Sequence, residues 1–108
     1  MYSIRRTKEF VVQLSYQDLI DVKIIKEKGE IVGFVLNLRC KINEIWHVVY
    51  RVDTAHGCLH EQRFWIGKEP IELPMFKGIS MQYIFNYFMN RIKQNFGRFR
   101  KYYEEKVK

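Results

Sequence analysis

The feature that most constrains the fold is a change of hydrophobic period late in the chain. From Ser80 onward, apolar residues recur at steps of three and four, and at about 100° per residue they form one stripe, typical of a helix packed on a core. The stripe consists of Met81, Ile84, Phe85, Phe88, Ile92, Phe96, Phe99 and Tyr103. We therefore predict a helix over about residues 81–105, with Ser80 as its N-cap and Gly97 on the side away from the core.

Before this helix, apolar and polar residues alternate, which is typical of strands with one buried face. We predict strands over residues 10–16, 22–26, 31–40, 45–53 and 58–66, with turns at 18–21, 27–30, 41–44 and 54–57. Residues 71–74 form at most a short edge piece, since proline limits ladder pairing. Gly29 can take the positive φ that a tight hairpin needs.

Alternation also predicts which residues share a face. In the third strand one face carries Val32, Phe34, Leu36, Leu38 and Cys40. In the fourth strand one face carries Trp46, Val48, Tyr50 and Val52, and the other carries His47, Val49, Arg51 and Asp53. With 108 residues the chain has enough sequence for one core. We expect a single α+β domain over residues 1–108, an antiparallel meander of about five strands with one long C-terminal helix packed on one face.

Composition narrows the function classes. Apolar runs stay below the roughly 18–20 residues that span a bilayer, and the first residues lack the apolar region of a signal peptide. These short apolar runs lead us to expect no membrane partner. The two cysteines fit no C-x-x-C pair, so we expect a reduced cytoplasmic protein with free thiols. The net charge of +7 favours a polyanionic partner, either RNA or an acidic protein, although it can also serve solubility.

One short segment, residues 51–60, gathers the candidate chemistry: Arg51, Asp53, His56, Cys58 and His60. In a catalytic interpretation, the two imidazoles exchange protons with a ribose hydroxyl and a leaving oxygen, Arg51 stabilises the phosphate, and Asp53 orients a histidine. No metal or cofactor is needed. A zinc site from these donors is an alternative. In the structural interpretation, the segment is an Asx-type turn with Gly57 at positive φ, and Cys58 is a structural thiol.

A second candidate surface lies beside the apolar stripe of the helix. Aromatic and cationic side chains fall together on one flank, where they can stack on bases and neutralise phosphates. The candidate nucleic-acid-binding residues are Tyr83, Tyr87, Arg91, Arg98 and Lys101, with Arg63 as a further cation. The alternative is the solvated border of a core helix, with half-buried tyrosines and extended arginines.

The sequence from Trp46 to His60 resembles a set of small prokaryotic proteins of unknown function. These share a W-x-x-V-x-R-x-D-T-A-H-G-x-x-H core followed by a C-terminal helix. The part from Arg51 to His60 is similar to the R-Y-D-N-A-H-G-x-x-H-x-H segment of TumE-type toxins from toxin–antitoxin pairs, although Val52 replaces the aromatic residue and the final H-x-H is absent. The resemblance implies an RNA-directed toxin–antitoxin component. A non-enzymatic interaction module, or a homodimer, is the rival hypothesis.

Overall fold

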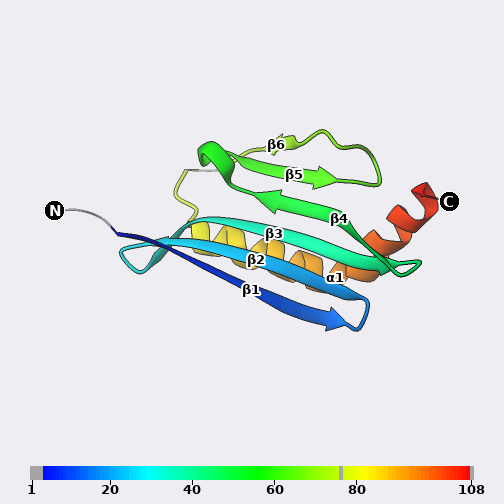
Figure 1. Ribbon diagram of the computed structural model, residues 1–108. Coiled ribbons are helices and arrows are strands. Elements are labelled where there is room, and N and C mark those ends of the chain that lie inside the picture. Colours follow the sequence, from blue (N-terminus) through cyan, green and yellow to red (C-terminus); the bar gives the residue numbers. More distant parts are fainter. Residues whose placement is uncertain (1–3, 76, 108) are drawn as a thin grey trace.

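The computed structural model describes residues 4–75 and 77–107, apart from the side chain of His56. The elements in chain order are β1 (Arg5–Ser15), β2 (Asp18–Glu27), β3 (Glu30–Ile42), β4 (Ile45–Asp53), the 3₁₀ helix η1 (Ala55–Gly57), β5 (Leu59–Arg63), β6 (Ile71–Leu73) and α1 (Met81–Lys106). The six strands form one antiparallel sheet in sequential order, and α1 lies behind it (Figure 1). The predicted α+β meander is therefore confirmed, with the short edge piece as a sixth strand.

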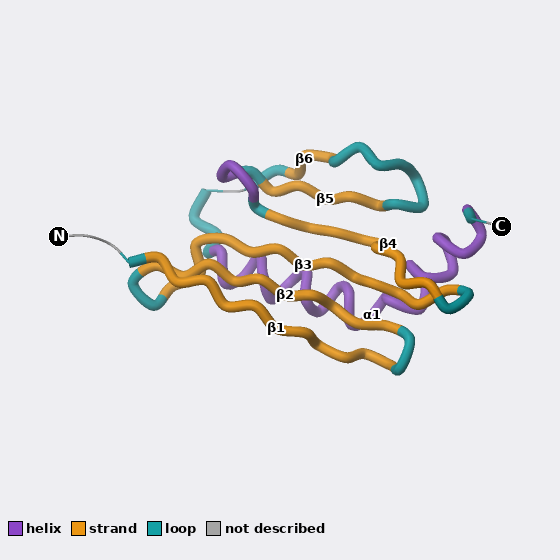
Figure 2. Tube along the Cα trace, viewed as in Figure 1, coloured by secondary structure: helices purple, strands orange, loops and turns teal. Residues whose placement is uncertain are grey.

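Two tight hairpins fix the long central strands. Lys28 and Gly29 join β2 to β3 with φ of 54° and 78°, and Asn43 and Glu44 join β3 to β4 with φ of 52° and 67°. Positive φ at both central residues is characteristic of type I′ turns, whose twist matches that of the flanking strands. The predicted positive φ of Gly29 is confirmed. Figure 2 shows these short loops at opposite ends of β3.

The predicted turn at residues 18–21 is wrong, because β2 already begins at Asp18. The Asp18 side chain is buried and lies against Arg100 of α1. Arg100 donates from Nη1 to both carboxylate oxygens of Asp18 at 3.1 and 3.2 Å, and from Nη2 to the Lys41 carbonyl at 2.7 Å. Its Nε donates to Glu104 at 2.6 Å. This network, in which the Asp18 carboxylate is buried, ties the second half of α1 to the sheet.

A bulge near the start of β3 changes which residues face the helix. Ile25 pairs with Gly33, but Lys26 pairs with Ile31, so Val32 is the extra residue. Ile31 is consequently buried, and Val32 is 38% exposed. The prediction that Val32 shares the core face was wrong, because an inserted residue reverses the alternation on one side of it.

A second bulge has the same effect in β4. Leu38 pairs with Tyr50 and Arg39 pairs with Val48, which leaves Val49 as the extra residue. Tyr50 therefore faces the core, whereas Trp46 lies beside the Arg39 guanidinium on the other face, 5.6 Å from ring centroid to Cζ. The predicted division of the strand holds only from Tyr50 onward.

The stripe of α1 packs on the sheet as the periodicity predicts. Six residues of the helix are buried: Ile84, Phe85, Phe88, Met89, Ile92 and Phe99. The rings of Tyr50, Trp65 and Phe99 pack against one another, and the Phe99 centroid lies 4.9 Å from that of Tyr50 and 5.1 Å from that of Trp65. Ser80 is the N-cap, since its hydroxyl accepts the Tyr83 backbone N–H at 3.1 Å. α1 contacts β3 and β4, so the middle of the sheet is the best-covered part.

The two edges of the sheet differ. β1 is an edge strand of 11 residues, most of them exposed, whereas β6 at the other edge has 3 residues. Among the described residues, no helix has both the length and the apolar character needed to cross a bilayer.

Candidate functional site

The candidate catalytic residues of β4 lie on the sheet face that α1 does not cover, called here the open face. Tyr50 and Val52 are buried on the helix side, and successive strand residues point to opposite faces, so Arg51 and Asp53 point to the open face. The Asp53 side chain is 10% exposed and accepts a hydrogen bond from Arg51 Nε at 3.1 Å. His60 Nδ1 lies 3.8 Å from Asp53 Oδ1, within ion-pair range. Arg51, Asp53 and His60 are therefore brought together.

The backbone between the strands explains this arrangement. Thr54 leaves the ladder toward β3: its N–H donates to the Phe34 carbonyl at 3.1 Å, and its hydroxyl accepts the Phe34 N–H at 2.9 Å. The chain then forms η1, with Gly57 at φ 74°, and returns as β5 so that His60 pairs directly with Asp53. The Ala55 N–H donates to Asp53 Oδ1 at 3.0 Å, which confirms the predicted Asx-type turn and the positive φ of Gly57.

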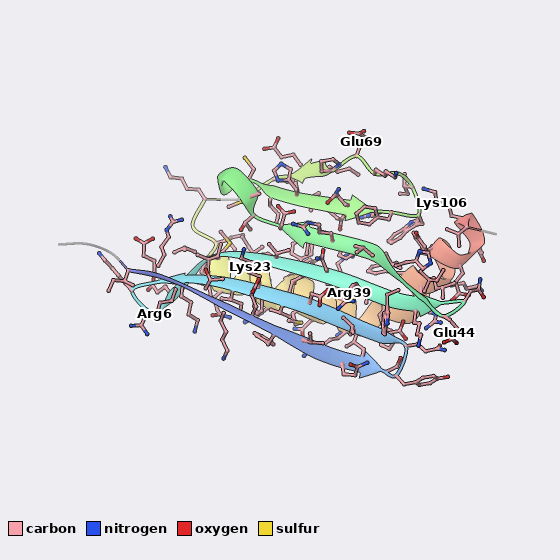
Figure 3. All side chains as sticks on the ribbon, in the orientation of Figure 1. Arg6, Lys23, Arg39, Glu44, Glu69 and Lys106 are labelled. Atoms are coloured by element: carbon pink, nitrogen blue, oxygen red, sulfur yellow. The ribbon has the colours of Figure 1, made fainter. Side chains whose placement is uncertain are left out.

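A shallow depression of about 520 Å³ adjoins the site on the open face. Its lining includes Arg51, Asn37 and Lys23, and Arg51 Nη1 donates to the Asn37 side-chain oxygen at 3.2 Å. The lining also holds the acidic residues Glu9 and Asp21. Asp21 is held by Arg39, whose Nη2 donates at 2.9 Å, and this hydrogen bond raises the pKa of Arg39. Figure 3 looks onto this face and labels Lys23 and Arg39 on adjacent strands.

Two further residues of the segment behave differently. The side chain of His56 lies outside the described part of the structure, although its backbone forms the middle of η1. A hydrogen bond to Glu72 raises the pKa of the Cys58 thiol, which favours the neutral, weakly nucleophilic form. Among the side chains that the structure describes, no three His, Cys, Asp or Glu residues gather as a metal site would require.

The predicted nucleic-acid-binding residues do not join this site. Arg63 pairs across the ladder with Tyr50 and donates to Glu61 at 2.8 Å, so it lies on the helix side of the sheet. Tyr83 and Tyr87 are 62% and 51% exposed. Together with Arg91 they line a groove of about 350 Å³ along α1, whose other lining residues are Asn86, Asn90, Gln94 and Asn95. Arg98 and Lys101 are exposed on α1 but do not line this groove.

Sequence reasoning missed Glu61, which is 3% exposed on the helix side. Its carboxylate accepts hydrogen bonds from the Tyr50 hydroxyl and from Arg63. Burial, followed by this hydrogen bond, raises the pKa of the Tyr50 phenol well above its usual range. Glu61 pairs across the ladder with the buried Val52, and directly paired residues share a face of the sheet. Strand alternation was therefore the signal that could have placed Glu61 on the helix side.

Comparison with known proteins gives one family. Residues 5–108 match the family model described as a domain of unknown function, DUF7718. No curated protein and no solved structure matches the chain. Because the family model spans nearly the whole sequence, the chain belongs to the DUF7718 family.

Proposed function

We propose that this protein is an RNA-directed component of a toxin–antitoxin pair that cleaves phosphodiester bonds without a metal. The observation that carries the proposal is the position of Asp53 between Arg51 and His60 on the open face. A partly exposed imidazole beside a carboxylate is suited to proton transfer, because the carboxylate stabilises the imidazolium that forms. The adjacent guanidinium is suited to a phosphate oxygen.

The proposed reaction uses the ribose of the substrate as nucleophile. His60 takes the proton of the 2′-hydroxyl, the 2′-oxygen bonds to phosphorus, and the bond from phosphorus to the 5′-oxygen breaks. A protonated His56, four residues earlier, gives its proton to the leaving 5′-oxygen. Arg51 stabilises the negative charge on the phosphoryl oxygens. The products are a 2′,3′-cyclic phosphate and a 5′-hydroxyl, and each histidine ends with the proton state that the other began with.

Three features support the biological setting of the proposal. The net charge of +7 attracts RNA, or an acidic antitoxin protein, through a long-range electrostatic term. The R-x-D-x-A-H-G-x-x-H pattern of residues 51–60 is the part similar to TumE-type toxins. Cys40 and Cys58 are free thiols, which suits the reducing cytoplasm.

The test is cleavage of end-labelled single-stranded RNA in EDTA by the wild type and by His56→Ala and His60→Ala variants. The matched control is His47→Gln, which removes the third histidine of the chain. His47 lies on the helix side of the sheet, with its Nδ1 3.1 Å from the Tyr103 hydroxyl. We expect the wild type and His47→Gln to leave cyclic phosphate ends, and both alanine variants to lose about 100-fold or more in rate. Equal rates in all four proteins, with unchanged thermal unfolding, would refute the role of the two histidines.

A second candidate function is a non-enzymatic interaction module or homodimer. The hydrogen bonds of Asp53 to Ala55 and of Thr54 to Phe34 favour it, because they give these buried polar groups a purely structural role. On this hypothesis Asp53→Asn lowers thermal stability, RNA stays intact with every variant, and the oligomeric state depends on protein concentration.

A further inference from the structure

A buried carboxylate on the helix side is shared by two arginines. Glu61 Oε1 accepts from Arg63 Nε at 2.8 Å, and Glu61 Oε2 lies 3.9 Å from Arg91 Nε. Oε2 also accepts the Tyr50 hydroxyl. Among the described residues, each of these arginines has Glu61 as its acidic partner, so two guanidinium charges face one carboxylate. The cluster therefore keeps one uncompensated positive charge.

The contacts of Arg91 indicate where that charge can act. Its Nε is buried and, among the described residues, has no hydrogen-bond partner, since 3.9 Å exceeds hydrogen-bond length. Its guanidinium carbon lies 5.7 Å from the centroid of the Phe99 ring, which restrains the group. The side chain is still 31% exposed and lines the groove along α1. A guanidinium that is held in place and partly exposed at the groove is suited to an anionic ligand.

The groove supplies the groups that would recognise the rest of such a ligand. Tyr83 and Tyr87 expose about half or more of their surface one helical turn apart, and aromatic rings spaced in this way can stack on unpaired bases. The side-chain amides in the lining, Asn86, Asn90, Gln94 and Asn95, offer both donors and acceptors. Acidic residues are absent from the described lining, so a phosphate meets no like charge there.

We propose that Arg63 and Arg91, balanced on Glu61, bind a backbone phosphate of single-stranded RNA whose bases stack on Tyr83 and Tyr87. The inference rests on the proposed function for the choice of RNA as ligand. It places RNA binding on the helix side of the sheet, away from the Arg51–Asp53–His60 site on the open face. Binding and cleavage are consequently separable, and an RNA that reaches both sites has to pass around the β6 edge of the sheet.

The test is fluorescence anisotropy with a labelled 2′-O-methyl oligouridine, which has no free 2′-hydroxyl and cannot be cleaved by the proposed reaction. Variants are Arg91→Gln and Arg63→Gln, with Lys93→Gln as matched control, because Lys93 is exposed on α1 outside the groove and its loss changes the net charge equally. We expect each arginine variant to weaken binding about tenfold or more, the scale of a lost charge-assisted hydrogen bond. The control should change affinity less than about twofold, since salt screens a remote charge.

Two further measurements separate phosphate contact from base stacking. Each arginine variant should reduce the slope of log Kd against log salt by about 0.7, as expected for one lost phosphate contact on a single strand. Tyr87→Leu should weaken binding about tenfold with an unchanged slope. Glu61→Gln should tighten binding, because it releases both guanidinium charges, even though it lowers thermal stability. Tightening by this substitution is a result that damage to the fold does not produce.

Arg91→Gln or Arg63→Gln matching Lys93→Gln in affinity would overturn the inference, as would a wild type that does not bind the oligonucleotide. Comparison with the cleavage assay distinguishes the two proposals. RNA cleavage that needs His60, combined with equal affinities of the arginine and lysine variants, would remove this inference and keep the proposed function. The expected binding pattern without any cleavage would keep the inference and remove the proposed function.

Discussion

Replacement of Arg100 by methionine tests the buried network that ties α1 to β2. The substitution keeps an unbranched side chain as far as the position of Nε, but it removes the guanidinium and leaves the Asp18 carboxylate, whose side chain is 6% exposed, without its cationic partner. Breaking a buried ion pair by removing one partner costs roughly 3–5 kcal/mol. Domains of this size unfold with about 5–15 kcal/mol, so a large part of the stability should be lost. With about 4–8 °C per kcal/mol, the melting temperature should fall by more than about 10 °C.

The assay is urea unfolding followed by tryptophan fluorescence, supported by thermal melts. Arg98→Met is the matched control, because Arg98 is exposed on the same helix and its loss removes the same charge. The control should stay within about 0.5 kcal/mol of wild type. In the double variant Asp18→Asn/Arg100→Met, much of the loss should be recovered, since no uncompensated charge remains buried. A cost below about 1 kcal/mol for Arg100→Met would refute the reasoning and class the pair with surface ion pairs.

Two further perturbations test the hairpin and the core. Lys28→Asn should raise the free energy of unfolding by about 0.5–1 kcal/mol, because Lys28 has φ 54° and asparagine tolerates this conformation better. Lys26→Asn is the control: Lys26 lies within β2, so this substitution should lower the free energy of unfolding. Burial raises the pKa of the Cys40 thiol, so the native state keeps a proton that the unfolded chain loses above about pH 8.5. The contribution of this thiol to the free energy of unfolding is therefore fully present below that pH. It declines as the pH rises, by about 1.4 kcal/mol per pH unit. In urea titrations between about pH 9 and 10, Cys40→Ala should flatten the slope by that amount, and an unchanged slope would contradict the burial argument.

The sequence predicts the architecture well because the deciding signals are local. The stripe of apolar residues predicts the helix. Ser80 marks its N-cap, and the helix ends close to the point where the stripe ends. The two type I′ turns are also marked by nearby residues. The bulges at Val32 and Val49 were not predictable, because each depends on how two strands align across the ladder. A one-residue insertion in the register leaves no trace in the sequence of one strand.

The candidate site was only partly predictable for a related reason. The grouping of Asp53 with Arg51 and His60 follows from their closeness in the chain and from the β4–β5 pairing. Arg63 lies on the other face of the sheet because it is three residues from His60 along β5, and residues at odd separations along a strand point to opposite faces. The partnership of Glu61 with Arg91 joins residues of β5 and α1, and the packing of α1 on the sheet is needed to see it.

The unequal edges of the sheet limit how far it can extend. Among the described residues, β1 offers an extended chain a continuous row of backbone partners 11 residues long, whereas β6 offers 3 residues. Two copies joined through β1 about a two-fold axis would turn their short β6 edges outward. Such a sheet terminates at a pair, because the second long edge that open-ended growth requires is missing. The protein can therefore leave one long edge strand unpaired without forming an open-ended filament.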